Sequence, residues 1–598
     1  MIRKSLGLAL LLLSCTASAV TTGRGGDDPP LGLWVFSVEA TRNDFVLTIE
    51  RTGDRWLAAV DGESTPIEVD GTRVTVRGPA GQSFDGQRAE DGQRIDGYWE
   101  QPATTLAYSR IVTKMILERV APDRWRGEVS AQPRPFAVFL DIFKTDRDGV
   151  AAVIRNPERN EILASRFRLE AEGQDRWGLF AGRGENQLRV ELHRHGIAEL
   201  RLFHPWFGDA ILLRPATARD AQRYFPRAPA PTYRHVPPAQ TGDGWSVIGS
   251  DEPGVDRGIL NALVQALATE DPRSRRPRLV HSMVVAYRGR LLFEEYFYGH
   301  DRNSRHDTRS MAKVFGPIMI GALRQQGSDI DPEDTPVADV LAGAGEAPSD
   351  PRKREITLGH LMSYSSGLDC DGVRPSQGSE DAMWSQKREA NLWRFTARLP
   401  LIYDPGTRYA YCSGSINMAA ASITAKSGLP LYETFDRLIA EPLNFGTYHW
   451  NLAPNGEGYL AGGVYMSPRD ILKLGVLYTA GGTWHGRRIL SADWITESTA
   501  PRIPISPETT RLSQSEFDDN YWGGEQAYVW RRDVVKAGDT TYASYEATGN
   551  GGQILLVVPD LELAVVLTGG NYRWGSIWGR WRDELVGTYV IPAIRSSP

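Results

Sequence analysis

Residues 30–218 carry short runs in which apolar and polar side chains alternate, separated by turns rich in glycine, aspartate and asparagine. A period of two residues is typical of half-buried β-strands, and helical periodicity is almost absent here. The tripeptide Asp-Arg-Trp recurs at 54–56, 123–125 and 175–177, each time after an alternating run. The pattern predicts an all-β N-terminal domain built from the repeated hairpins of a meander.

The start of this region, Gly32-Leu33-Trp34, resembles the Gly-x-Trp motif of lipocalin-like barrels. Because the motif is only three residues long, we expect a supporting or docking sheet more than a ligand-binding barrel. The alternative is a domain that binds a lipid or glycan and presents it to the rest of the chain. A proline-rich stretch then ends the strand pattern, and we place an extended linker at 219–250.

Residues 251–598 mix strand and helix patterns. Apolar runs at 283–293 and 553–567, each interrupted by turn residues, predict two β-hairpins. Apolar residues recur at helical spacing after position 310 and again in a terminal segment at 576–594. The pattern indicates an antiparallel sheet with helices packed on it.

Composition narrows the class of protein. The chain has 598 residues, of which 41% are hydrophobic and 24% charged, and a formal net charge of -6. Such a length predicts two or three domains, and such a composition excludes a disordered chain and a polytopic membrane protein. Lysine and arginine are scattered along the chain, so no nucleic-acid-binding surface is predicted.

The N-terminus has the pattern of a secretory signal. Two basic residues precede a leucine-rich run at 6–13 that is too short to span a membrane. Ala17-Ser18-Ala19 fits a signal-peptidase site, so we expect residues 1–19 to be removed and the mature protein to be periplasmic or secreted. The alternative is a lipoprotein anchored through Cys15, because the tetrapeptide ending there is similar to a bacterial lipobox, although its second residue fits poorly.

The most informative motif is Ser310-Met311-Ala312-Lys313, which opens an apolar helical stripe. Residues three apart on a helix share a face, so the Lys313 amine can reach the Ser310 hydroxyl. A serine hydroxyl is a weak nucleophile that needs such a base, and burial lowers the pKa of a lysine towards neutrality. The tetrapeptide also occurs by chance, so its meaning depends on accompanying motifs. Pro317 is expected to kink this helix by removing a backbone hydrogen bond.

The accompanying motifs are Tyr411-Cys412-Ser413 and Thr548-Gly549-Asn550. With Ser310-x-x-Lys313 they stand in the order of the class C β-lactamase-like serine hydrolases, which the chain resembles over about residues 282–592. The resemblance implies an α/β (α+β) β-lactamase/transpeptidase-like domain at 251–598, with an antiparallel sheet flanked by helices. Besides β-lactamases, this family includes esterases, D-amino-acid peptidases and hydrolases of linear 6-aminohexanoate oligomers.

By position, the resemblance implies a role for each motif residue. Ser310 would form an acyl-enzyme, with Lys313 and Tyr411 as acid/base partners. Substrate or oxyanion contacts would come from Ser413, Thr548, Gly549 and Asn550, with the backbone amides of Ser310 and Asn550 as the oxyanion hole. A nearby lysine ammonium is expected to lower the pKa of the Tyr411 phenol, and which of the two residues is the base stays open.

Two departures from the family pattern bear on the substrate. Ser413 stands where relatives have asparagine, and Ala547 stands where they have lysine or histidine. A lost charged hydrogen bond to a substrate carboxylate is worth about 1.5–3 kcal/mol, so the substitution at Ala547 disfavours classical β-lactamase activity. Lys536-Ala537-Gly538 mimics the missing motif, but we expect it to form a hairpin turn.

Cys370 and Cys412 are the cysteines that remain if Cys15 is removed with the signal. Export to an oxidising compartment favours a disulfide between them, which would hold the Tyr411 motif in place. Two buried free thiols are the alternative.

We expect no cofactor and no metal, because the chain has no His-Glu-x-x-His, Cys-x-x-Cys, P-loop or Gly-x-Ser-x-Gly motif. The expected partner is a small ester or amide substrate, with no nucleic acid, and with a membrane only if Cys15 is lipidated. The sequence does not determine the oligomeric state.

The sequence therefore predicts an exported carboxylesterase or amidase that cleaves an ester or a small amide, such as a linear amide oligomer or a D-amino-acid peptide. Alternatives are a true β-lactamase and a non-catalytic cell-envelope binding protein on the same fold. The joint presence of Ser310, Lys313 and Tyr411 disfavours the binding protein.

Overall fold

The computed structural model describes most of the chain. The described residues are 28–38, 44–102, 110–130, 136–146, 149–160, 166–182, 188–196, 198–205, 207–250, 252–343, 345–520, 523–575 and 577–595. The expected signal at 1–19, with Cys15, lies outside these residues. No helix in the described ranges is long and apolar enough to cross a membrane.

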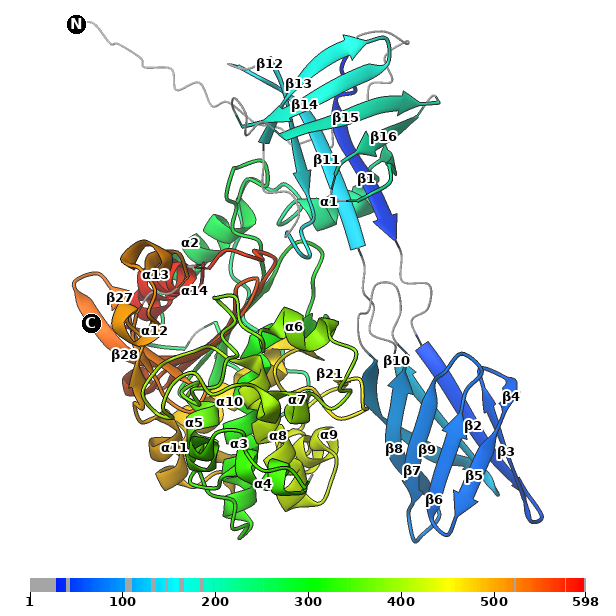
Figure 1. The fold of residues 1–598 in the computed structure, drawn as a ribbon. Helices are drawn as coiled ribbons and strands as arrows, with labels where there is room; N and C mark the ends of the chain where they lie inside the picture. The colour runs from blue at the N-terminus through cyan, green and yellow to red at the C-terminus, as the bar shows by residue number, and fades with distance from the viewer. Residues whose placement is uncertain are drawn as a thin grey trace, which may run out of the picture.

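The N-terminal strands form two separate structures (Figure 1). Strand β1 pairs on one side with β11 and on the other with β17, which closes a barrel. In order around it, the strands are β1 (Gly32–Val38), β11 (Phe136–Thr145), β12 (Gly149–Arg155), β13 (Arg166–Gly173), β14 (Arg176–Ala181), β15 (Leu188–His195), β16 (Glu199–Phe203) and β17 (Ile211–Pro215).

Side chains fill the barrel with a packed core. Trp34, Leu140, Trp177 and Leu202 are all buried in one cluster. The all-β prediction for this region is confirmed. The expected sheet closes into a barrel, with Trp34 on the closing strand β1, and its supporting role stays a prediction. The closure could not be read from the sequence, because β1 and β11 are separated by the inserted strands.

An open antiparallel sheet is inserted between β1 and β11. Its order is β4-β3-β2-β10-β9-β8-β7-β6-β5. The strands are β2 (Asp44–Thr52), β3 (Arg55–Val60), β4 (Glu63–Thr65), β5 (Ile67–Asp70), β6 (Arg73–Arg77), β7 (Ser83–Arg88), β8 (Arg94–Gln101), β9 (Ile111–Ala121) and β10 (Arg124–Ser130).

The repeated Asp-Arg-Trp tripeptides lie at hairpins, as predicted. In the hairpins β2–β3, β9–β10 and β13–β14, the aspartate lies in the turn and the arginine begins the following strand. Asp123 and Asp175 have φ of 56° and 60°, a left-handed turn conformation that aspartate tolerates better than most residues. Trp125 and Trp177 then point into the cores of the inserted sheet and the barrel respectively.

The inserted sheet continues into the C-terminal part of the chain. Strand β9 pairs with β21 (His449–Asn451), β21 with β22 (Val464–Met466), and β22 with β20 (His306–Asp307). A buried hydrogen bond of 2.6 Å between Thr113 Oγ1 and His449 Nδ1 strengthens the junction. A hydrogen-bonded ladder therefore runs from the N-terminal sheet to the residues that precede Ser310.

The C-terminal body is built on an antiparallel sheet of order β19-β18-β30-β29-β28-β27-β26-β25. The strands are β18 (Val280–Tyr287), β19 (Arg290–Tyr296), β25 (Ile503–Pro504), β26 (Glu525–Gln526), β27 (Arg531–Ala537), β28 (Thr540–Gly549), β29 (Gln553–Val558) and β30 (Leu563–Gly569). Both predicted hairpins, β18–β19 and β29–β30, are confirmed.

Helices cover both faces of this sheet, which explains the unbroken apolar runs in its strands. In β29, Leu555 and Val557 pack on one face while Ile554 and Leu556 pack on the other. The first face is covered by helices that include α3 (Phe315–Gln325), α8 (Ser413–Ser427) and α10 (Pro468–Thr479). The second is covered by α2 (Arg257–Ala268), α14 (Ile577–Trp581), the π-helix Arg582–Val590 and α15 (Ile591–Arg595).

Shorter helices complete the body. They are α4 (Pro336–Gly343), α5 (Leu358–Met362), α6 (Glu380–Ser385), α7 (Leu392–Arg398), α9 (Leu431–Phe435), α11 (Ala492–Thr499), α12 (Pro507–Thr510) and α13 (Gln514–Asn520). The mixed helix and sheet architecture expected for the C-terminal part is confirmed.

The segment expected to be a linker lies against the C-terminal body. Its first residues form helix α1 (Ala218–Tyr224), because Thr217 and Asp220 make a capping box. Further along, Trp245 is 1% exposed and its indole nitrogen donates to the Arg469 carbonyl at 3.3 Å. The proline-rich composition indicated an extended chain, but it did not show that this chain packs against a neighbour.

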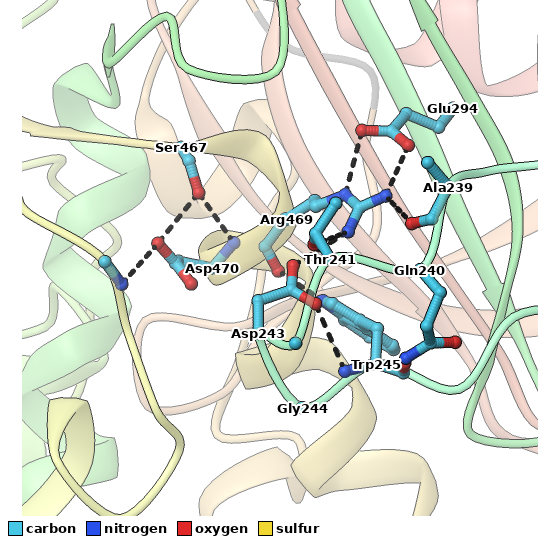
Figure 2. A network of polar contacts seen from close by, with 12 residues as sticks. Ala239, Gln240, Thr241, Asp243, Gly244, Trp245, Glu294, Ser467, Arg469 and Asp470 are labelled. Carbon is cyan, nitrogen blue, oxygen red and sulfur yellow. Dashed lines mark hydrogen bonds and ion pairs between the residues drawn. The ribbon is translucent and has the colours of Figure 1, made fainter.

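Arg469, in the first turn of α10, anchors this segment (Figure 2). Its guanidinium donates to both carboxylate oxygens of Glu294 at 2.8 and 2.6 Å. It also donates to Asp243, to Thr241 and to the Ala239 carbonyl, each at 2.8 Å. The Arg469 and Glu294 side chains are only 4% and 3% exposed, so the guanidinium compensates a buried carboxylate charge, whereas its partners in the connecting segment lie nearer the surface.

We predict that Arg469→Met lowers the free energy of unfolding by about 3–5 kcal/mol, because it leaves the buried Glu294 carboxylate without its cation. The matched control is Arg290→Met, which breaks a more exposed ion pair with Glu252 and should cost at most about 1 kcal/mol. Urea denaturation followed by tryptophan fluorescence measures both. Equal losses for the two variants would contradict this account.

Candidate active site

Ser310 and Lys313 lie on a single turn of helix. The turn is the 3-10 helix Arg309–Val314, directly before α3, and Lys313 Nζ donates to Ser310 Oγ at 2.8 Å. Residues three apart are eclipsed in a 3-10 helix, so this geometry brings the two side chains together. Pro317 is the third residue of α3, where a backbone N–H has no partner within an α-helix, and the expected kink there stays a prediction.

Lys313 is held away from water. Its side chain is fully buried, and its ammonium also donates to the Ala461 carbonyl and lies 5.0 Å from the centre of the Tyr411 ring. Burial lowers the pKa of Lys313 to about 8, opposed by the charge of Glu380 and assisted by that of Arg309. A substantial fraction of Lys313 is therefore neutral near pH 8, as a general base requires.

Tyr411 approaches the same hydroxyl from another element. It lies just before α8, and its phenol is hydrogen-bonded to the Ser310 side chain. Burial raises the pKa of Tyr411 above its usual range; the bond to Ser310 opposes this rise and the charge of Glu380 adds to it. The expectation of a lowered pKa was wrong because desolvation of the phenolate outweighs the favourable neighbours.

Glu380, the first residue of α6, is a site residue that sequence reasoning missed. It lines the same cavity as Ser310 and Tyr411, and its charge raises the pKa of Lys313. Its carboxylate accepts from Ser413 Oγ at 3.0 Å and from the Tyr459 hydroxyl at 2.7 Å. No motif marks this position, and its partners come from distant parts of the chain. Ser413 is buried and hydrogen-bonded to Glu380, and its expected contact with the substrate stays a prediction.

The end of β28 closes the other side of the site. Thr548, Gly549 and Asn550 line the cavity with Ser310, and their contacts with a substrate or oxyanion stay predictions. A Cβ at Gly549 would lie 2.5 Å from the Thr308 carbonyl oxygen, so only glycine allows β28 to approach the Ser310 turn this closely. The Asn550 side chain accepts a hydrogen bond of 2.9 Å from the Arg573 backbone amide. This bond ties the loop after β28 to the loop after β30.

A cavity of about 520 Å³ opens at Ser310. Its walls include Tyr364, Tyr409, Trp574 and Trp578, and charged side chains of Glu380, Arg531, Glu546 and Arg573 also face it. A volume of this size with aromatic walls and a few polar groups is typical of a small-molecule site.

The family's basic residue is absent at Ala547, which is buried in the core. Arg531 reaches the cavity from the neighbouring strand, where it lies opposite Glu546. Burial lowers the pKa of Arg531 to about 10, and the Glu546 carboxylate opposes that shift. Lys536-Ala537-Gly538 ends β27 and starts its turn, as predicted.

A disulfide joins Cys370 to Cys412. Cys412 is the residue that caps the N-terminus of α8, so the bond fixes the backbone next to Tyr411. Within the described ranges, no group of three or more histidine, cysteine or carboxylate side chains is arranged to hold a metal ion.

We predict that replacing both cysteines by alanine lowers the free energy of unfolding by about 4 kcal/mol, the loop-closure value for a separation of 42 residues. Differential scanning calorimetry of this variant, against the oxidised parent, measures the loss. An unchanged melting temperature would show that the bond does not constrain the chain.

We predict that the rate of Ser310 acylation rises with pH through about 8, since Lys313 accepts a proton only when neutral. Glu380→Gln removes a charge that raises the pKa of Lys313, so this limb should move to lower pH. Asp381→Asn, a charge change at the next residue of α6, is the control and should leave the limb in place. A profile of kcat/KM against pH tests this; a limb that does not move in Glu380→Gln would contradict the assignment.

Comparison with known proteins identifies the family to which this chain belongs. A family model described as Beta-lactamase matches residues 260–570. A 6-aminohexanoate-dimer hydrolase of Paenarthrobacter ureafaciens is 25% identical over 284 residues, which are 44% of this chain and 71% of that protein. An Escherichia coli (strain K12) protein, provisionally assigned as a D-alanyl-D-alanine carboxypeptidase, is 26% identical over 157 residues, 26% of this chain and 35% of its own length.

Among solved structures, a family VIII carboxylesterase is 15% identical with a TM-score of 0.38, covering 49% of this chain and 87% of that one. The family match spans over half of the chain, from within α2 to just beyond β30, and it contains every motif residue brought together around the cavity. The chain belongs to the beta-lactamase family of serine hydrolases and has its β-lactamase/transpeptidase-like fold.

Proposed function

We propose that this chain is an exported serine hydrolase that cleaves an ester or a small amide through an acyl-enzyme on Ser310. The observation that carries the proposal is the fully buried Lys313 amine at 2.8 Å from the Ser310 hydroxyl, at the edge of a cavity large enough for a small molecule. A buried amine whose pKa is lowered to about 8 is partly neutral near that pH, and its neutral form can accept the hydroxyl proton.

The proposed reaction has two halves. Neutral Lys313 accepts the proton of Ser310 as its oxygen attacks the substrate carbonyl carbon, and the backbone amides of Ser310 and Asn550 receive the oxyanion. Tyr411, hydrogen-bonded to Ser310, relays a proton to the departing alcohol or amine. Water then attacks the acyl-enzyme with the same groups acting in reverse, which releases the acid and restores the serine. Lys313 is favoured as the base because burial makes the Tyr411 phenolate costly.

The substrate class rests on the charges and walls of the cavity. Aromatic side chains of Trp574 and Trp578 suit an apolar acyl or leaving group, while Arg531 and Arg573 suit a substrate that also carries a carboxylate. Linear amide oligomers and D-amino-acid peptides fit this description, and the names of the two sequence relatives agree with it. Ala547 leaves no cation at the position from which relatives contact a β-lactam carboxylate, and Arg531 and Arg573 would hold a carboxylate at other places in the cavity, so β-lactam hydrolysis is the less favoured reaction.

Export is part of the proposal. The basic and leucine-rich start of the chain has the form of a secretory signal. The Cys370–Cys412 disulfide agrees with this, because such bonds persist in oxidising compartments.

The test is labelling of the purified protein with a fluorophosphonate probe, followed by peptide mass spectrometry. We expect one adduct, on Ser310, that is lost in Ser310→Ala and retained in Ser385→Ala, which changes an exposed serine of α6. Hydrolysis of p-nitrophenyl esters should disappear with the same variant. A folded protein that neither labels nor turns over these esters would favour the binding-protein alternative.

A further inference from the structure

A loop of the barrel lies directly behind the Ser310 turn. The loop, residues 156–160, follows β12. The Asn160 amide donates to the Gly570 carbonyl at 2.9 Å, and the Pro157 carbonyl is hydrogen-bonded to His281 Nε2 at 2.9 Å. A Cβ at Gly570 would lie 2.0 Å from the Pro157 oxygen, so the contact is too close for any other residue there. The barrel is therefore fitted to the C-terminal body at this point.

Arg159 is the residue of this loop that reaches towards the nucleophile. Its guanidinium lies 3.2 Å from Asp307 Oδ2, and the Asp307 side chain is only 7% exposed. It also lies 5.7 Å from the centre of the Tyr572 ring. The Arg309 guanidinium lies 5.0 Å from the centre of the same ring, so both cations pack on Tyr572. Arg159 thus holds a buried carboxylate three residues before Ser310.

Asp307 in turn holds the residue next to the nucleophile. Its Oδ1 accepts a hydrogen bond from the Arg309 backbone amide at 2.9 Å. Arg309 has a φ of 50°, a left-handed conformation that costs a residue with a side chain about 1–3 kcal/mol and persists only where its surroundings impose it. The backbone conformation of Arg309 sets the direction in which the chain continues to Ser310, and the hydrogen bond from the Arg309 amide to Asp307 helps to hold that conformation.

We propose that Arg159 is a positioning residue for Ser310, so that the N-terminal barrel forms part of the catalytic apparatus. Arg159 fixes the Asp307 carboxylate, Asp307 fixes the strained Arg309 backbone, and this backbone sets the place of the Ser310 hydroxyl relative to Lys313. Arg159 itself touches neither substrate nor Ser310. The inference rests on the proposed serine hydrolysis but extends it to a domain outside the matched family region.

The test compares fluorophosphonate acylation of the full chain and its variants, with the maximum rate and the probe affinity measured separately. Arg159→Met should lower the maximum acylation rate between about 10- and 100-fold, the cost of a small misplacement of a reacting group, while probe affinity stays within about two-fold. Arg159→Lys keeps a cation near Asp307 and should recover most of the rate.

The matched control is Arg273→Met. It breaks another ion pair between the barrel and the C-terminal body, Arg273 with Asp141 at 2.6 Å, without touching Asp307. It should acylate at the unaltered rate, whatever its effect on the melting temperature. Equal slowing in Arg273→Met and Arg159→Met would show that docking in general matters, and would overturn the specific role of Arg159.

A folded Arg159→Met variant that reacts at the unaltered rate would also overturn the inference. If this variant does not fold, Asp307→Asn decides the question, because it keeps the shape of the side chain and removes the charge that Arg159 holds; an unaltered rate there would contradict the inference. If the parent protein itself fails to label, the proposed function is wrong and this inference fails with it. If the parent labels and Arg159→Met labels at the same rate, only the inference about Arg159 is wrong and the proposed function stands.

Discussion

The site depends on one constraint, the exclusion of water from Lys313. In water a lysine is almost fully protonated at neutral pH and could not accept the proton of a serine. Burial of the ammonium lowers its pKa to about 8, so that part of Lys313 is neutral near this pH. The neutral amine lies 2.8 Å from the Ser310 hydroxyl, close enough to accept its proton. Gly549, Tyr411 and Ala461 surround this lysine or its serine, so each of the motif segments helps to keep the pair dry or in place.

The N-terminal structures contact the segment that carries this serine–lysine pair. A nucleophile paired with a buried base must be held within a few tenths of an ångström, and the turn that carries Ser310 begins with a strained Arg309. That turn is supported from one direction by the strand ladder from β9 through β21 and β22 to β20, and from the other by the barrel loop with Arg159. The N-terminal strands are thus built into the support of the site, and the Arg469 network ties the connecting segment to the same body.

Local patterns predicted much of this arrangement. Alternation predicted the hairpins around the three Asp-Arg-Trp tripeptides, and the spacing of Ser310-x-x-Lys313 predicted that these two side chains meet, because spacing along a chain indicates which side chains share a face. The barrel closure, Glu380, Arg531 and Arg159 could not be predicted. Each depends on contacts between segments far apart in sequence, such as Glu380 with Tyr459 or Arg159 with Asp307. The direction of the Tyr411 pKa was mistaken for the same reason, since burial is a property of the folded chain.

The most direct test is to measure the pKa of Lys313 itself. Lysine labelled with ¹³C at the ε position allows each ammonium to be titrated by NMR, and the signal lost in Lys313→Arg identifies the residue. The account predicts a titration midpoint near 8, well below the usual value of about 10.4 for lysine. A midpoint at that usual value would mean that Lys313 stays protonated under working conditions, and would contradict its role as the base.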